Sequence, residues 1–477
     1  MAASAIVGPK TSPTHSWWLE NFKPSVAAVA APPDAVDVCV IGAGMTGCAV
    51  AYWLRSLGVS EDVVVMDARG VAGGATGRNG GHLWCNPASD FERVTTAELL
   101  TFIAERNVDC DLQHGGAAAL TRQHADAAAV YYDAADDPEA ATAEEEWGEE
   151  EVAWDAEACA SSLGGSNSFM HATVYPEALQ FYPAKVADAL LEASGAALVA
   201  PVRIASIVGG EVGAGGVDAS PVDLAWENTE DGRTGTLRAR RVVVATNGWA
   251  GELLPELAAN VYPTRAPRIE DPHCMHSLLI SCDPHCMHSL LISCDHTHPI
   301  ARSRGSRCTG NQVLMTAPLP AALAWKVGGI SVDSDVGARE LYAIRRADGR
   351  ICFGGARALE PDAAIGSSDD ATTSTVVGDY LRRFLREHFP ELGGGAAGGE
   401  VEVEAEWTGV LGFTTDGKPI VGPLARRPAV YVAAGFCGHG MPQCYGVGKS
   451  IALMLGGRAD EVHEHIRDEA APARWGY

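Results

Sequence analysis

The chain has 477 residues, of which 47% are hydrophobic and 20% charged, the balance of a globular protein with a large core. Acidic residues outnumber basic ones by 61 to 35, and the net charge of −26 leaves no basic surface for nucleic acid or anionic lipid. The sequence contains no run of about 18 apolar residues, so we expect no membrane span. The 13 cysteines are scattered, and residues 1–24 lack the apolar centre of a signal peptide, which predicts a cytoplasmic protein with reduced thiols.

The first predicted element is a strand at residues 36–41, where the sequence is almost continuously apolar. Such a run is typical of a strand buried on both faces of a parallel sheet. A glycine turn follows at residues 42–47, then a helical pattern over 48–57 and a second apolar run over 63–66 that ends in Asp67. The glycine motif alone would be a weak signal, but in this order of elements it predicts a dinucleotide-binding unit.

Each part of this unit has a physical task in binding a dinucleotide. Gly42 permits the tight turn, Gly44 lets the backbone approach a pyrophosphate, and Gly47 lets the helix pack closely on the strand. The N–H groups at the start of the helix attract the phosphates, and the acidic residue accepts hydrogen bonds from a ribose. The cofactor-binding residues predicted here are Gly42, Gly44, Met45, Thr46, Gly47 and Asp67.

The segment Arg69–Trp84 (R-G-V-A-G-G-A-T-G-R-N-G-G-H-L-W) stands where an NAD-dependent dehydrogenase would continue with another strand–helix unit. Its glycines suit a loop that presses backbone against a flat ligand. With this segment the sequence begins to resemble the D-amino-acid-oxidase-like family of FAD-dependent oxidoreductases, which includes glycine oxidase, sarcosine oxidase and gamma-glutamylputrescine oxidase. Further blocks resemble the same family: Tyr182–Lys185, which opens a helix followed by a strand through Val199 and Val202, then Arg241–Trp249, Trp407–Gly409, Thr415–Gly422 and Tyr431–Met441.

The resemblance implies an α/β (α+β) fold in which a Rossmann-like FAD-binding domain is interleaved with a substrate domain built on a mixed β-sheet. A hairpin of that sheet is predicted from the alternating pattern and Asp-Gly turn of residues 340–353. The implied boundaries are an N-terminal extension of residues 1–33, an FAD-binding domain of residues 34–100, 176–260 and 400–465, and a substrate domain of residues 101–175 and 261–399.

The cofactor implied by the resemblance is FAD, bound without a covalent link because Arg78–Asn79 stands where one covalently flavinylated group has Trp-His. The final glycine loop, residues 438–441, is expected against the flavin ring, where N–H groups and a helix start stabilise negative charge. No second dinucleotide motif occurs, so the electrons are expected to come from the substrate. The further cofactor-binding residues implied are Ala68, Arg69, Gly74, Thr76, Arg78, Asn79, Gly80, Gly81, Val202, Ala245, Thr246, Asn247, Gly248, Gly409, Gly438, Gly440 and Met441.

One segment has no counterpart in the family. The sequence of residues 271–282 recurs unchanged at 283–294, inside an insertion of residues 266–309. Two copies are too few for a solenoid. The Cys and His residues of the repeat invite a zinc interpretation, but their spacing matches no known type of zinc site, so we expect no metal. We hypothesise a duplicated loop whose deletion leaves flavin binding intact; loss of FAD from the deletion variant would reject this hypothesis.

The chemistry expected from the resemblance is transfer of hydride from the carbon next to an amine nitrogen to flavin N5, followed by hydrolysis of the imine. The flavin is then the main catalyst, and the protein supplies position and electrostatics. The candidate catalytic residues are His82 and His439, which either tune the protonation of the amine or are hydrogen-bonded structural histidines. Oxygen is the expected acceptor, with another electron acceptor as the alternative.

The sequence differs from that of the amino-acid-oxidising family members at the position that holds the substrate. After Trp407–Thr408–Gly409–Val410 the chain has Leu411, where those members have an arginine that holds the substrate carboxylate. Either Arg345 or Arg346 of the predicted hairpin replaces that arginine, or the substrate lacks an α-carboxylate, as in oxidases of the gamma-glutamylputrescine type. The alternatives in other classes are oxidation of a C–OH bond, as in 2-hydroxy acids, and a non-catalytic flavoprotein subunit.

Overall fold

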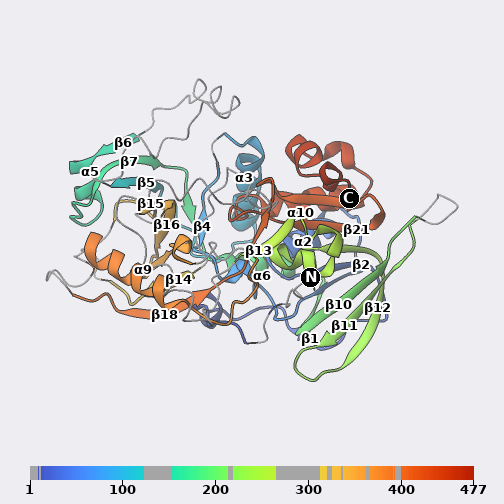
Figure 1. Cartoon of the computed structure of the whole chain (residues 1–477). Coiled ribbons are helices and arrows are strands. Elements are labelled where there is room, and N and C mark those ends of the chain that lie inside the picture. Colours follow the sequence, from blue (N-terminus) through green and yellow to red (C-terminus); the bar gives the residue numbers. More distant parts are fainter. Residues whose placement is uncertain are drawn as a thin grey trace, which may run out of the picture.

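The computed structural model describes most of the chain, and two large β-sheets organise it (Figure 1). The insertion of residues 266–309 and its repeat lie outside the described residues. No helix in the described part of the chain is long and apolar enough to cross a membrane. The described residues are 9, 12–86, 88–122, 152–212, 219–264, 312–319, 325–334, 337–360, 366–389, 392 and 399–477.

The first sheet has nine strands, and its centre is parallel. Strand β2 pairs in parallel with β3 on one side and with β12 on the other, and β12 also pairs in parallel with β21. An antiparallel meander of β10, β11 and β12 extends from it at the lower right of Figure 1. In sheet order the strands are β1 (Ala28–Val29), β9 (Ala197–Val199), β3 (Val63–Met66), β2 (Ala35–Ile41), β12 (Thr234–Val244), β11 (Val222–Asn228) and β10 (Val202–Gly209), with β21 (Arg427–Ala434) beside β12 and β20 (Ile420–Leu424) beside β21.

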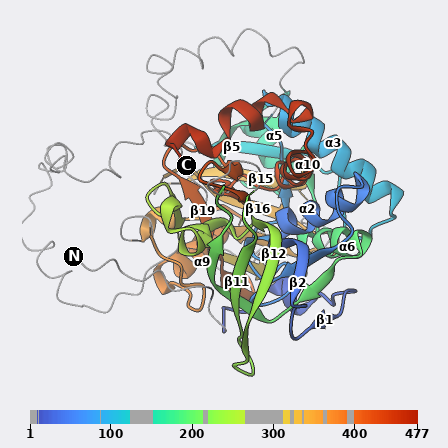
Figure 2. The same ribbon diagram turned by 90° about the vertical axis from the view of Figure 1, so that its right-hand side faces the viewer.

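The second sheet has eight strands and is mixed, because β15 and β5 pair in parallel while the other pairs are antiparallel. It lies on the left of Figure 1 and behind β2, β11 and β12 in Figure 2. The predicted hairpin is confirmed as the antiparallel pair β16–β17. In order, the strands are β18 (Val403–Thr408), β14 (Gln312–Thr316), β17 (Ile351–Gly354), β16 (Gly337–Arg345), β15 (Gly329–Ser334), β5 (Ala117–Arg122), β7 (Phe169–Tyr175) and β6 (Val152–Asp155).

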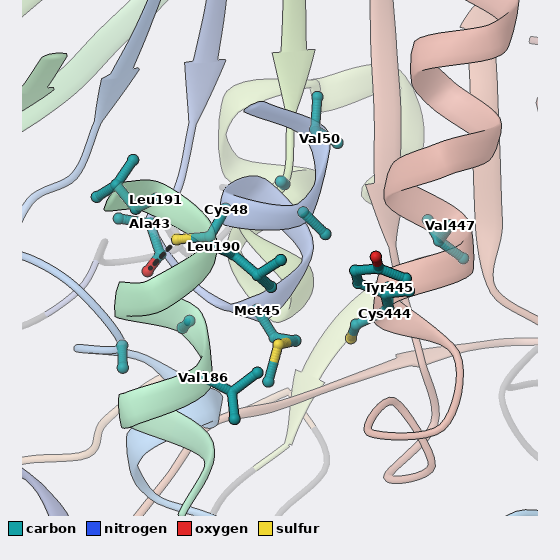
Figure 3. Close-up of a cluster of buried hydrophobic side chains, with 14 of the residues drawn as sticks. Ala43, Met45, Cys48, Val50, Val186, Leu190, Leu191, Cys444, Tyr445 and Val447 are labelled. Atoms are coloured by element: carbon teal, nitrogen blue, oxygen red, sulfur yellow. Dashed lines mark hydrogen bonds between the residues drawn. The ribbon is translucent and has the colours of Figure 1, made fainter. Parts of the chain in front are cut away.

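The two faces of β2 enter two different cores, as expected for a strand buried on both sides. Val38 and Val40 pack in the core that contains the helices α2 (Met45–Ser56), α6 (Pro183–Ser194) and α10 (Cys444–Leu455). Cys39 and Ile41 pack in the core beneath the β10–β12 meander. Figure 3 shows side chains of the three helices, among them Met45, Leu190 and Tyr445, lying between the helices. This packing fixes the start of α2 beside the start of α10.

Two short strand pairs join the large sheets and carry predicted site residues. Strand β4 (His82–Leu83) pairs with β8 (Leu179–Gln180), and β13 (Val261–Thr264) pairs with β19 (Leu411–Thr414). They bring residues far apart in sequence to the region between the sheets.

The predicted fold class, an α/β (α+β) fold with mixed sheets, is confirmed, whereas the division into domains stays a prediction. One strand differs from its expected sheet: β18, in the segment assigned to the FAD-binding domain, pairs with β14 of the eight-stranded sheet. The single strand expected through Val199 and Val202 is also wrong. The chain forms two strands there, β9 and β10, separated by a cis Ala200–Pro201 bond, because proline cannot donate a ladder hydrogen bond.

Candidate functional site

A cavity of about 1200 Å³ opens at the carboxyl ends of β2, β3 and β12, next to the start of α2. Crevices at such a position, where the chain leaves neighbouring strands in opposite directions, are the usual ligand sites of α/β sheets. We call it the first cavity. Most of the predicted cofactor-binding residues line it: Gly42, Gly44, Met45, Thr46, Asp67, Ala68, Arg69, Gly74, Thr76, Asn79, Val202, Ala245, Thr246, Asn247, Gly438, Gly440 and Met441.

The glycine turn at residues 42–47 shows whether this cavity has the shape that a dinucleotide needs. Gly42 has φ +110°, and a Cβ there would lie 2.6 Å from the Ala245 carbonyl oxygen. A Cβ on Gly44, which lines the cavity, would lie 3.1 Å from the Thr76 hydroxyl. A Cβ on Gly47 would lie 1.8 Å from the Gly42 carbonyl oxygen. A side chain at Gly42 or Gly47 would collide with backbone, and one at Gly44 would crowd the Thr76 hydroxyl, so the turn has the tight, side-chain-free backbone that a pyrophosphate needs.

Asp67, at the end of β3, organises the same turn. Its Oδ2 accepts a hydrogen bond from Ala43 N at 2.8 Å, and its Oδ1 accepts from Arg69 N at 2.7 Å and Gly70 N at 2.9 Å. The carboxylate is therefore oriented by backbone donors at the edge of the cavity. Each carboxylate oxygen accepts about two hydrogen bonds, so Oδ2 retains capacity for a ribose hydroxyl. Binding of the ribose by Asp67 stays a prediction.

Residues 74–81, called here the cavity loop, separate the first cavity from a second one of about 930 Å³. Thr76 Oγ1 accepts a hydrogen bond from Met45 N at 2.9 Å, so the loop reaches the first turn of α2. Ala75 and Asn79 line both cavities, as do Leu411 of β19 and Gly438 and Met441 before α10. A flat ligand in the first cavity would thus adjoin the second. The residues present fit FAD.

The second cavity lies under the eight-stranded sheet. Tyr342 of β16 and Ile330 and Ser331 of β15 form its wall on that side, together with Trp84 after β4. These residues were not predicted, because nothing local in the sequence distinguishes a strand residue that faces a cavity from one that faces the core. The predicted residues that line it are Arg78, Asn79, Gly80, His82, Gly409, Leu411, Gly438, His439 and Met441.

His82 is held among aromatic rings in the second cavity. Its ring centroid lies 5.8 Å from that of Tyr342 and 6.3 Å from that of Trp84. Neither ring nitrogen has a hydrogen-bond partner among the described residues. Burial lowers the pKa of His82 to about 4, so the imidazole is neutral near pH 7. It can donate or accept a hydrogen bond but carries no charge.

His439, on the loop before α10, has a partner that sequence reasoning missed. Its Nε2 lies 3.0 Å from Glu92 Oε2, and Gln443 Nε2 donates to Glu92 Oε1 at 2.7 Å. Glu92 lies on α3 (Asp90–Glu105) and is 4% exposed. Its Oε2 also accepts a hydrogen bond from Asn86 N at 2.7 Å, so the carboxylate accepts three bonds in all. Burial raises the pKa of Glu92, but the hydrogen bonds from His439, Asn86 and Gln443 outweigh it, and the net pKa is lowered.

We expect a Glu92→Gln variant to lose about 1–3 kcal/mol of unfolding free energy at neutral pH, because a carboxamide replaces an acceptor of charge-assisted hydrogen bonds. The folded-state pKa of Glu92 lies below its ordinary value of 4.5. Between these two pH values the unfolded chain therefore binds more protons than the folded chain. The contribution is present above pH 4.5 and lost as the pH falls through the folded pKa. Urea unfolding should therefore show the difference between wild type and variant shrinking on acidification.

The matched control is Glu98→Gln on the same helix. Glu98 pairs with Lys449 at 2.5 Å, but both side chains are about one-third exposed, so its loss should cost under about 1 kcal/mol. A Glu92→Gln deficit that stays constant with pH would contradict the expected role of the carboxylate charge.

Six predicted residues line neither cavity: Gly47, Gly81, Gly248, Arg345, Arg346 and Trp407. The three glycines support the walls by close packing, as at Gly248, where a Cβ would lie 2.8 Å from the Leu411 carbonyl oxygen. Trp407 is fully buried and donates from Nε1 to the Arg78 carbonyl at 3.0 Å.

Arg346 lies away from both cavities, in a cage of aromatic rings. Its guanidinium lies 4.5 Å from the ring centre of Trp17 and 4.9 Å from that of Trp18, and it pairs with Asp111 at 3.0 Å. These contacts use its charge and stacking faces, so we do not assign it to substrate binding.

Arg78 lines the second cavity, but its guanidinium is hydrogen-bonded to backbone carbonyls. Nη1 donates to the Thr14 and Thr408 carbonyls, each at 2.9 Å, and Nε donates to the Gly73 carbonyl at 3.2 Å. Burial lowers its pKa to about 10, against the opposing effect of Asp370. Arg78 therefore joins three segments of backbone rather than presenting a charge to a ligand.

No group of three or more His, Cys, Asp or Glu residues suited to a metal ion occurs in the ranges that the structure describes. The Cys and His residues of the repeat lie outside those ranges.

Comparison with known proteins agrees with this geometry. A family model described as FAD dependent oxidoreductase matches residues 37–274 and 291–454. A probable oxidoreductase OrdL of Rhizobium meliloti is 24% identical over 473 residues, 94% of this chain and 90% of the relative. Gamma-glutamylputrescine oxidoreductase of Escherichia coli is 37% identical over 98 residues, 17% of this chain and 22% of the relative. Glycine oxidase from Bacillus cereus has the same fold, with a TM-score of 0.64 at 15% identity over 91% of this chain and 97% of that chain.

Proposed function

The chain belongs to the FAD dependent oxidoreductase family, and from that premise we propose that it oxidises the C–N bond of an amine that lacks an α-carboxylate. FAD is its cofactor and, when bound, supplies the two-electron oxidant. Oxygen is the proposed final acceptor. The sequence similarity of one segment to gamma-glutamylputrescine oxidoreductase supports an amine substrate.

This proposal rests on the second cavity, whose described lining residues offer no cation that is available to bind a carboxylate. Among its described lining residues the one arginine is Arg78, whose guanidinium is bonded to backbone carbonyls. His82 is neutral, and His439 is paired with Glu92. Leu411 lines both cavities where an arginine would hold a carboxylate. An α-carboxylate would thus enter an apolar, aromatic space without a cation to compensate its desolvation.

The residues of the chain position and shield the reacting amine. Trp84 and Tyr342 provide aromatic walls that exclude water and accept the apolar part of an amine. His82 offers an uncharged hydrogen-bonding group that leaves the amine neutral, the form needed for oxidation. The start of α10 reaches the first cavity at Cys444, where its N–H groups stabilise negative charge.

The proposal is tested by adding substrates to the purified holoenzyme without oxygen and following the flavin absorbance. Polyamine derivatives and secondary amines should bleach the band, whereas D-amino acids should not. Bleaching by amino acids alone would overturn the assignment of substrate class. Admitting air afterwards tests oxygen as the acceptor, because peroxide should then form in proportion to the amine consumed.

A Leu411→Arg variant should gain D-amino-acid oxidation. The side chain borders both cavities, so a guanidinium there can pair with an α-carboxylate. A charge-assisted bond of about 1.5–3 kcal/mol corresponds to about a 10- to 100-fold gain in kcat/KM for amino acids. Amine turnover should fall, because the cationic group repels the protonated amine. Leu411→Met, which keeps volume without charge, is the control, and an equal response of both variants would count against this placement of the substrate.

A further inference from the structure

Residues 14–20, which include α1 (Trp17–Glu20), lie along the cavity loop and are called here the N-terminal strap. Ser16 Oγ donates to the Gly77 carbonyl at 2.5 Å, and Trp18 Nε1 donates to the Asn79 carbonyl at 2.8 Å. Ser16 and Trp18 are 1% and 0% exposed; the bond from Ser16 is buried, and the bond from Trp18 is partly buried because Asn79 is half-buried at the cavities. Two carbonyls of the cavity loop therefore depend on donors from a segment distant in sequence.

Side chains of the strap also fit against the glycines of the cavity loop. A Cβ on Gly77 would lie 2.6 Å from Leu19 Cδ2, and a Cβ on Gly81 would lie 3.2 Å from the Trp18 ring. A larger residue at Gly77 would require the Leu19 side chain to move, and one at Gly81 would press on the Trp18 ring. The strap and the loop are thus matched in shape as well as in hydrogen bonding.

Besides the bond from Arg78 of the cavity loop to Thr14, the strap has anchoring contacts outside that loop. Thr14 N donates to the Asp370 carbonyl at 2.7 Å, and Thr408 N donates to Thr14 Oγ1 at 3.0 Å. The Tyr182 hydroxyl donates to the Trp18 carbonyl, and the Arg346 guanidinium lies over the Trp18 ring. These contacts come from the eight-stranded sheet, its neighbouring segments and α6. The strap is therefore a fixed support rather than a tail that follows the loop.

Asn79 connects the strap to both cavities. Its Nδ2 donates to the Ala75 and Thr76 carbonyls at 3.1 and 2.9 Å, and its Oδ1 accepts from Gly81 N at 2.7 Å. Asn79 and Ala75 line both cavities. A displacement of the Asn79 backbone would therefore move the wall that the cavities share.

We propose that Trp18 is a positioning residue: its indole N–H holds Asn79, and the strap thereby controls how tightly the chain retains FAD. This assignment rests on family membership and on the contacts of the strap, and is independent of which substrate is oxidised.

The test compares Trp18→Phe with Trp17→Phe in the purified holoenzyme, following flavin fluorescence as FAD is released after dilution. Phenylalanine keeps an aromatic ring and removes the indole donor. Loss of this partly buried hydrogen bond should speed FAD release from Trp18→Phe by about tenfold and alter its visible spectrum. Trp17 is also buried, and its ring packs against Arg346 and Arg350, so Trp17→Phe should change the release rate by less than about twofold.

Equal release rates and identical spectra in the two variants would overturn the proposal and leave the strap a purely structural element. Ser16→Ala provides a second measurement, which decides the matter if Trp18→Phe does not fold. It removes the bond to the Gly77 carbonyl and leaves both indoles in place. Faster FAD release from Ser16→Ala supports control of the loop by the strap, and an unchanged rate contradicts it.

Discussion

A Gly47→Ala variant is expected to lose bound FAD and at least about 3 kcal/mol of unfolding free energy, beyond the upper range of ordinary overpacking. The added Cβ would lie 1.8 Å from the Gly42 carbonyl oxygen and 3.3 Å from Val40 Cγ1. The first contact is with backbone, which has no rotamer to relieve it. Helix α2 must therefore move away from β2, and the N–H groups at its start leave the position in which they bind phosphate.

The measurement is the FAD content of the purified chain together with its urea unfolding curve. Gly58→Ala, at the other end of the same helix, is the matched control. Gly58 has φ +64° but nothing lies within 4 Å of its added Cβ, so the cost is only backbone strain of about 1 kcal/mol. A Gly47→Ala protein with full FAD content and the stability of Gly58→Ala would refute the close-packing role.

An Asp370→Asn variant should lose about 3–5 kcal/mol of unfolding free energy, because it removes the buried carboxylate that compensates the largely buried charge of Arg69. Arg69 Nη1 and Nη2 donate to the two Asp370 oxygens at 2.7 and 2.9 Å. The side chains of Arg69 and Asp370 are 11% and 0% exposed. Since Arg69 lines the first cavity, FAD affinity should fall with stability.

Urea unfolding of Asp370→Asn is compared with that of Glu404→Gln. Arg350 also holds Glu404 through two bonds, at 2.8 and 3.1 Å, but these side chains are 21% and 33% exposed, so water compensates the loss. The control variant, Glu404→Gln, should lose under about 1 kcal/mol of unfolding free energy. The double variant Arg69→Met/Asp370→Leu should recover part of the deficit, because no unpaired charge remains buried. Equal losses in Asp370→Asn and Glu404→Gln would contradict this account.

Predictions from local pattern succeeded where neighbouring residues alone decide the structure. The apolar run of residues 36–41, the glycine turn and the acid at Asp67 define β2, the start of α2 and the end of β3. The turn at residues 347–349 likewise lies between β16 and β17. Resemblance to a family then indicated later glycines of the site: Gly74, Gly438 and Gly440 line the first cavity, and Gly80 and Gly409 line the second.

Sequence patterns did not reveal the partners of side chains whose contacts come from distant parts of the chain. Arg346 looked available for substrate because it follows an alternating strand, yet two tryptophans of the N-terminal strap enclose it. The sequence pattern did not single out Glu92, which the loop before α10 buries under His439 and Gln443.

The sequence by itself determined the dinucleotide-binding unit and the absence of an arginine at Leu411, since these depend on residue type and on spacing within short segments. Its resemblance to a family implied FAD as the cofactor. Only the tertiary structure decided which groups carry charge and which support the site. The neutrality of His82, the low pKa of Glu92 and the support of Asn79 by Trp18 arise from burial and from hydrogen bonds between segments. Desolvation and hydrogen bonding act through space, so a linear pattern of residues does not encode them until the sheets and helices have packed.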